Sequence, residues 1–188
     1  MRLRWVLPST IAITLLLFTV VIADGRQESP ELVIDGSVAP DFAEVADAEW
    51  ETFVASFPAL ESCLGRVTLV AEYTLDDRAR YDSQSRTMTV RVPGPKVLLD
   101  RALVHELAHH IEFSCASQVE MRPVFLAALG RDGGEAWFEG AEWGLIPSEI
   151  FAEAVVENVL DERGRAHTGI GLVDQGAVDV VIRWANGG

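Results

Sequence analysis

The sequence contains few basic residues. Fifteen lysines and arginines stand against 29 aspartates and glutamates in 188 residues, which gives a formal net charge of −14. A protein that binds nucleic acid needs a basic face to neutralise phosphates, and peripheral docking on anionic lipid needs a basic patch. The composition therefore predicts no nucleic-acid partner and disfavours a protein that docks on a membrane surface.

The sequence also lacks the features of a disordered chain and of a large multidomain protein. Hydrophobic residues make up 49% of the chain and charged residues 23%, which is enough apolar side chain to build a core. The length favours one domain. No internal repeat and no low-complexity tract occurs. The composition thus predicts a single globular domain.

Charge is absent from one stretch near the N-terminus. Between Arg4 and Asp24 lie 19 uncharged residues, Trp5 to Ala23, which would span roughly 28 Å as a helix. Residues 1–23 therefore resemble either a secretory signal peptide cleaved before Asp24 or a signal anchor kept as one transmembrane helix. In both cases Arg2 and Arg4 would hold the N-terminus inside and send the rest of the chain outward. We expect an extracellular protein, secreted or anchored by this segment, with a membrane contact only through such an anchor.

The remainder of the chain is more acidic than the whole. Because residues 1–23 contain two of the 15 basic residues and none of the 29 acidic ones, the exported part carries 13 bases and a net charge of −16. The chain has only two cysteines, Cys63 and Cys115. An even number of cysteines outside the cytosol predicts one disulfide; two buried free thiols are the alternative.

Hydrophobic periodicity predicts a mixed α and β domain over residues 41–188, preceded by a polar arm or tether at 24–40. Two strands are expected, at 66–73 and 86–92, joined by a polar connection. A loop rich in glycine and aromatic residues is expected at 130–144. It would either wall or cap an active site or be a plain surface loop that packs Trp137 and Trp143 inward. Helices are expected at 40–57, 97–113, 118–129, 147–160 and 173–184.

The residues that suggest chemistry lie in the helix predicted at 97–113. His105 and His109 are four residues apart, so a helix presents both from one face, one turn apart. That spacing allows both imidazoles to bind one zinc ion, while Glu106 between them can accept a proton from a zinc-bound water. Leucines and alanines surround these residues, and burying them without a compensating metal would be costly. Histidines on a solvated face are the alternative, and His110, about 100° around the helix, fits that alternative.

A zinc site of this kind needs a third protein ligand. Cys115 follows His105 by ten residues, but exported cysteines usually pair with each other. Glu149 lies in the first turn of the helix predicted at 147–160, and Glu153 follows one turn later on the same face. We expect Glu149 to bind the metal and Glu153 to accept the N–H of His105 and so fix its tautomer. The alternative is an amphipathic helix whose glutamates, including Glu157, face water.

These two motifs resemble a known family. His-Glu-Leu-Ala-His-His at 105–110, followed by Glu-Ile-Phe-Ala-Glu-Ala-Val at 149–155, is similar to the gluzincin branch of zinc metallopeptidases, in particular to the catalytic domain of anthrax lethal factor and its small bacterial relatives. The resemblance covers roughly residues 86–160 in the order of elements, with identity confined to the two motifs. It implies a zincin-like fold, His105, His109 and Glu149 as ligands, and Glu106 as general base.

The sequence departs from this family at one position. Such enzymes place a tyrosine shortly before the ligand glutamate, whereas Trp143 occupies that neighbourhood here. The group that stabilises the oxyanion could be His167, Tyr81, Tyr73 or Arg131. We expect His167, which follows the ligand helix, although a plain surface histidine is the alternative.

Together these patterns predict an exported zinc-dependent endopeptidase with an α+β, zincin-like fold. A small sheet would pack on the active-site helix and on the second, glutamate-bearing helix. One zinc ion would activate water, Glu106 would act as general base, and the substrate would be a peptide or protein. The alternative is a catalytically inactive zincin-like domain used for binding or as a scaffold.

Overall fold

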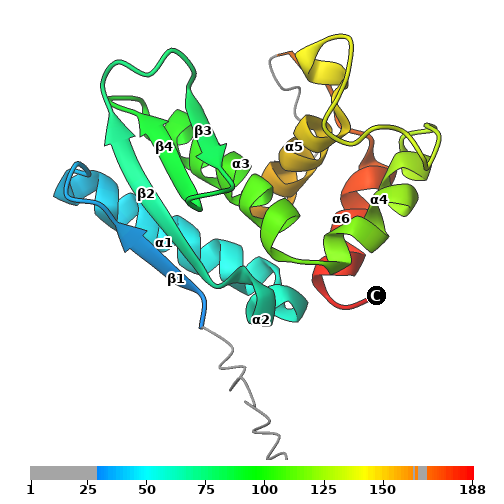
Figure 1. The fold of residues 1–188 in the computed structure, drawn as a ribbon, viewed down its shortest axis with the longest axis horizontal. Helices are drawn as coiled ribbons and strands as arrows, with labels where there is room; N and C mark the ends of the chain where they lie inside the picture. The colour runs from blue at the N-terminus through cyan, green and yellow to red at the C-terminus, as the bar shows by residue number, and fades with distance from the viewer. Residues whose placement is uncertain (1–28, 163, 165–168) are drawn as a thin grey trace, which may run out of the picture.

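A computed structural model describes residues 29–162, 164 and 169–188 (Figure 1). The apolar span at 5–23 and His167 lie outside these residues. Within them, every helix is too short or too polar to cross a membrane. The domain combines helices with one small mixed sheet, so the α+β class is confirmed.

The sheet has four strands in the order β1-β2-β4-β3. β1 (Glu31–Ile34) and β4 (Thr87–Arg91) both run parallel to β2 (Arg66–Glu72), whereas β3 (Ala79–Asp82) runs antiparallel to β4. Residues of β2 alternate between buried and partly exposed positions, as a strand with one face on a core requires. β3 forms one edge of the sheet and lies against the helix that carries the histidines (Figure 1).

Two strands differ from the sequence-based expectation. β1 lies inside the range 24–40, expected to be a polar arm, and β3 lies inside the expected polar connection. Each has only four residues, which is too short for a clear period of two, and each is stabilised by a neighbouring strand. Asp82 begins the β3–β4 turn by accepting the backbone N–H of Gln84 and the hydroxyl of Ser85. The domain therefore begins before residue 41.

The five predicted helices are confirmed, with ends shifted by one or two residues. Three short helical turns accompany them. Pro40 and Pro147 stand at the start of their helices, where the missing proline N–H costs nothing. The helices are α1 (Pro40–Ser56), η1 (Pro58–Leu60), α2 (Glu61–Leu64), α3 (Lys96–Ser114), α4 (Ser117–Ala128), η2 (Trp143–Leu145), α5 (Pro147–Val159) and α6 (Gln175–Ala185).

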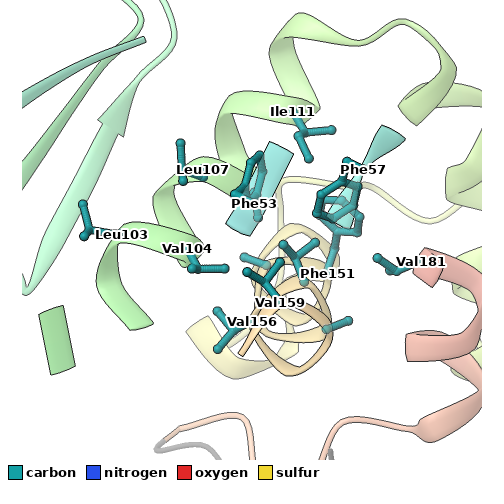
Figure 2. Close-up of a cluster of buried hydrophobic side chains, with 14 of the residues drawn as sticks. Phe53, Phe57, Leu103, Val104, Leu107, Ile111, Phe151, Val156, Val159 and Val181 are labelled. Carbon is teal, nitrogen blue, oxygen red and sulfur yellow. The ribbon is translucent and has the colours of Figure 1, made fainter. Parts of the chain in front are cut away.

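Helix α5 lies at the centre of the helical layer. Ten of its 13 residues are buried, which explains why its sequence is apolar on almost every side. Figure 2 shows Phe151, Val156 and Val159 of α5 enclosed by side chains from α1, α3 and α6. This packing sets α5 beside α3 and so determines where the first turn of α5 meets the two histidines.

A disulfide joins Cys63 and Cys115, as expected. It links α2 to the residue that ends α3, with Cα atoms 5.1 Å apart. The bond leaves Cys115 no free thiolate, so the alternative of Cys115 as third metal ligand is wrong. It also anchors the C-terminal end of the histidine-bearing helix.

Replacing both Cys63 and Cys115 by alanine should destabilise the domain by about 4 kcal/mol, because the bond closes a loop of 52 residues. Urea unfolding followed by circular dichroism measures this difference. Reducing the unmutated protein should produce a similar loss, which separates the effect of the crosslink from that of the lost sulfur packing. Equal unfolding midpoints for the oxidised protein and the double variant would contradict the prediction.

Candidate metal centre

Three side-chain donor atoms from α3 and α5 converge at one point. His105 Nε2 lies 3.1 Å from Glu149 Oε2 and 3.2 Å from His109 Nε2, and His109 Nε2 lies 3.6 Å from the same Glu149 oxygen. All three donors lie within 4.8 Å of one another. The spacing of four residues places both histidines on one face of α3, and the packing of α5 brings Glu149 opposite them. The structure thus brings together the three residues predicted as metal ligands.

The outer nitrogens of both histidines are held by carboxylates. His105 Nδ1 donates to Glu153 Oε1 at 3.0 Å, as expected from the sequence, and His109 Nδ1 donates to Glu112 Oε2 at 2.7 Å. With a proton on each Nδ1, a neutral imidazole carries a lone pair on Nε2. Both lone pairs therefore face each other and the carboxylate of Glu149, an arrangement that a proton or a metal ion between them would stabilise.

The pKa values of these groups also favour positive charge in the cluster. Burial lowers the pKa of His105, but hydrogen bonds to Glu149 and Glu153 outweigh it and raise the pKa to about 9. In His109, burial is likewise outweighed by bonds to Glu112 and Glu149, which raise the pKa to about 10. The same histidines lower the pKa of Glu149 to about 2 against the opposing effect of burial. The cluster attracts positive charge strongly, whether a proton or a metal ion supplies it.

Glu153 is held by a second partner. Arg101, one turn before His105 on α3, donates from Nη2 to Glu153 Oε2 at 2.7 Å and also pairs with Glu162. Glu153 and Glu157 are both buried, and Glu157 accepts the backbone N–H of Gly164 and the amide of Gln175. The alternative of a water-facing row of glutamates on α5 is therefore wrong.

Glu112 is a site residue that the sequence did not identify. Its side chain is fully buried and also accepts the indole N–H of Trp137 at 2.6 Å and the hydroxyl of Ser148 at 2.8 Å. The one sequence feature that could have indicated this role was an acidic residue three positions after His109 on an apolar helix. That spacing alone does not show that the loop 130–144 and the start of α5 cover Glu112.

His110 was expected to fit a solvated face, and that expectation is wrong. It is fully buried, donates from Nε2 to the carbonyl oxygen of Leu64 at 2.7 Å, and accepts the hydroxyl of Tyr81 on Nδ1 at 2.9 Å. Burial lowers its pKa to about 4, although the bond to Leu64 opposes the shift. His110 therefore ties α3 to both the end of α2 and the edge strand β3.

A cleft of about 710 Å³ opens beside the three donor atoms. One wall is formed by β3 and the residues before it, and the floor is formed by α3. The opposite wall is formed by the start of α5 and the loop at 130–144. From that loop Phe138 and Trp143 line the cleft, and the Trp143 ring stacks on His105 with centroids 6.2 Å apart. Trp137 of the same loop instead packs into the hydrophobic core.

Glu106 also borders this cleft. It is 5% exposed, and burial raises its pKa, while His105 and His109 oppose that rise. A carboxylate whose proton affinity is raised and which faces a cleft can accept a proton and later return it. Its position beside both histidines agrees with the role expected of a general base.

The residues expected to stabilise an oxyanion lie in different parts of the structure. The hydroxyl of Tyr81 is bonded to His110, and burial raises its pKa to about 12, so it remains a protonated phenol at the edge of the cleft. Arg131 is bonded to Glu135 and to the carbonyl oxygen of Leu145. Tyr73 is 75% exposed and does not border the cleft. Of the candidates that the structure describes, only Tyr81 lies in the cleft.

No protein-family model, curated protein or solved structure matches this chain.

The buried neutral His110 should make the domain acid-sensitive. Its folded-state pKa of about 4 lies below the value of about 6.5 for an unfolded histidine, so the unfolded chain binds the additional proton. Stability from this residue is complete above pH 6.5 and should fall by up to about 3 kcal/mol as the pH drops towards 4.

The variant His110→Gln keeps a donor for Leu64 and removes the titration. Urea unfolding at pH 7.5, 6, 5 and 4 should show a smaller loss of stability in the variant than in the unmodified protein. Parallel pH profiles for the two proteins would contradict the assignment of this sensitivity to His110.

Proposed function

We propose that this domain is an exported zinc-dependent endopeptidase. The observation that carries the proposal is the convergence of His105 Nε2, His109 Nε2 and Glu149 Oε2, with a carboxylate on the outer nitrogen of each histidine. Glu106 beside them supplies a proton acceptor in the same cleft. Metal ions and acid–base groups in this arrangement are typical of metal-assisted hydrolysis.

The donor set suits zinc. Two imidazoles and one carboxylate are the ligands found in catalytic zinc sites, which keep a fourth position open. Glu153 and Glu112 fix the ring orientation and tautomer of the two histidines, as partners of metal-bound imidazoles do. When bound, zinc supplies a Lewis acid for a peptide carbonyl and lowers the pKa of water.

The residues of the chain would divide the remaining work. Glu106 would take a proton from the attacking water and deliver it to the nitrogen of the leaving peptide. Tyr81 keeps its hydroxyl proton and borders the cleft, but its bond to His110 would have to change before it could donate to an oxyanion. The stacked ring of Trp143 covers one side of His105 and limits its contact with water.

The edge of the sheet offers a place for an extended substrate. β3 is the last strand in the order β1-β2-β4-β3, and Ala79 and Tyr81 border the cleft. A peptide in extended conformation can add to such an edge through backbone hydrogen bonds. This arrangement, with α3 beside the sheet and α5 packed on α3, supports a zincin-like architecture as the finer description of the fold.

The disulfide supports export. Disulfides persist in oxidising compartments and are rare in the cytosol, and Cys63 and Cys115 are bonded here. We therefore propose that the domain acts outside the cell, on peptides or proteins, either free or held by the apolar N-terminal segment.

Metal analysis tests the site first. The purified protein, freed of metal and dialysed against zinc, should retain one equivalent of zinc, whereas His109→Ala and Glu149→Gln should retain little. Glu120→Gln, on the exposed side of α4, should behave as the unmodified protein and serves as the matched control. A correctly folded protein that retains no zinc would contradict the proposal.

Cleavage of an unfolded protein such as casein then tests the activity. Glu106→Gln should keep its zinc and lose at least 100-fold in rate, because general acid–base catalysis typically contributes about 10²–10⁴-fold. The alternative, an inactive binding or scaffold domain, is favoured by the occupation of the Tyr81 hydroxyl by His110. Zinc retention without cleavage by the unmodified protein would support that alternative and contradict the peptidase.

A further inference from the structure

An arginine at the rim of the cleft has buried nitrogen atoms without a partner. Arg78 immediately precedes β3 and borders the cleft. Its Nε and Nη2 atoms are buried and form no hydrogen bond with the described residues. Buried donors are normally paired, because an unpaired polar or charged group costs free energy. The structure of the described residues alone does not provide the partner of this guanidinium.

The guanidinium is held in place by a glycine. A Cβ atom added at Gly94 would lie 2.0 Å from Arg78 Nη2 and 2.9 Å from Cζ. Only a residue without a side chain leaves room for the guanidinium in this position. Arg78 is therefore seated against the backbone of Gly94 rather than extended into solvent.

The charge on Arg78 is not neutralised locally. Burial, and after it the neighbouring Arg91, lowers the pKa of Arg78. Arg91 is itself bonded to the carbonyl oxygens of Leu75 and Asp76. Arg80, two residues further on, is exposed and also borders the cleft, and neither it nor Arg78 has a carboxylate within 4.0 Å among the described residues. The β3 wall of the cleft thus carries two arginines without an ion-pair partner among the described residues, beside one acidic residue, Asp77.

From this geometry we infer that Arg78 binds a carboxylate of the substrate. This inference deepens the proposed function, on which it rests, by naming an acidic peptide as the preferred ligand. A carboxylate accepts charge-assisted hydrogen bonds from a guanidinium, which makes arginine well suited to recognise it. The carboxylate is either that of an aspartate or glutamate side chain or that of a free C-terminus. Arg80 adds positive charge to the same wall.

The negative net charge of the protein opposes the binding of an acidic peptide. With a net charge of −14, the protein as a whole repels acidic peptides. A preference for an acidic peptide over its neutral counterpart must therefore arise from a local site.

Three ten-residue fluorescein-labelled peptides test this preference. The first alternates valine and glutamate and has an amidated C-terminus, and the second has glutamine in place of glutamate. The third is the glutamine peptide with a free C-terminal carboxyl group.

Binding is measured by fluorescence anisotropy on the Glu106→Gln protein, so that the peptides stay intact, with zinc present and again with metal removed. The glutamate peptide, the free-carboxyl peptide, or both should bind at least tenfold more tightly than the amidated glutamine peptide. Whichever binds more tightly identifies the source of the carboxylate. Because the metal-free measurement does not depend on zinc or on cleavage, it tests Arg78 even if the proposed peptidase activity fails.

Two further substitutions separate a positioned guanidinium from general charge. Arg78→Gln should reduce the preference to within twofold, and Gly94→Ala should do the same while keeping the charge, because the new Cβ displaces the guanidinium. Arg183→Gln, which removes an exposed arginine on α6, should leave the preference intact. Thermal melts verify that each variant is folded. Equal binding of all three peptides, or a preference that persists in Arg78→Gln or Gly94→Ala, would overturn the inference.

Discussion

The packing of α5 against α3 is the contact on which the rest of the site depends. Each histidine comes from α3 and the opposing carboxylate from the first turn of α5, so neither helix alone forms the cluster. The apolar surface of α5, enclosed by α1, α3 and α6, fixes the relative position of the two helices (Figure 2). Hydrophobic burial thereby holds three electron-pair donors closer together than they would remain in water. In the proposed metal site, the packing of the core therefore supplies the energy that keeps the three donors together.

Acidic residues serve two purposes in this protein. Many of the 29 acids lie on the surface and give the chain its negative charge, but Glu106, Glu112, Glu153 and Glu157 are buried. Three of these four lie around the two histidines: Glu153 and Glu112 through hydrogen bonds, and Glu106 from the same helix through its charge. They raise the proton affinity of the imidazoles and would favour a divalent cation by the same electrostatic effect. Against this background the unpaired Arg78 is an exception, and it lies on the wall where a substrate would bind.

Much of the fold and of the candidate site could be predicted because it depends on local spacing. The separation of His105 and His109 follows from one helical turn, and the five long helices follow from their apolar periodicity. Other features depend on contacts that no local pattern specifies. β1 and β3 exist as strands because β2 and β4 pair with them. Glu112 and His110 look like ordinary polar positions on α3 until Trp137, Ser148, Leu64 and Tyr81 are brought to them by distant segments. Glu149 was predictable only because the two motifs were considered together.

In the proposed enzyme, His105, His109 and Glu149 bind one zinc ion. X-ray absorption spectroscopy at the zinc edge, on protein loaded with one equivalent, tests it most directly because it reports the ligand atoms themselves. The spectrum should show nitrogen and oxygen ligands at about 2.0–2.1 Å, with the multiple scattering of two imidazoles and no sulfur. A zinc–sulfur distance of about 2.3 Å, or scattering from fewer than two imidazoles, would contradict it.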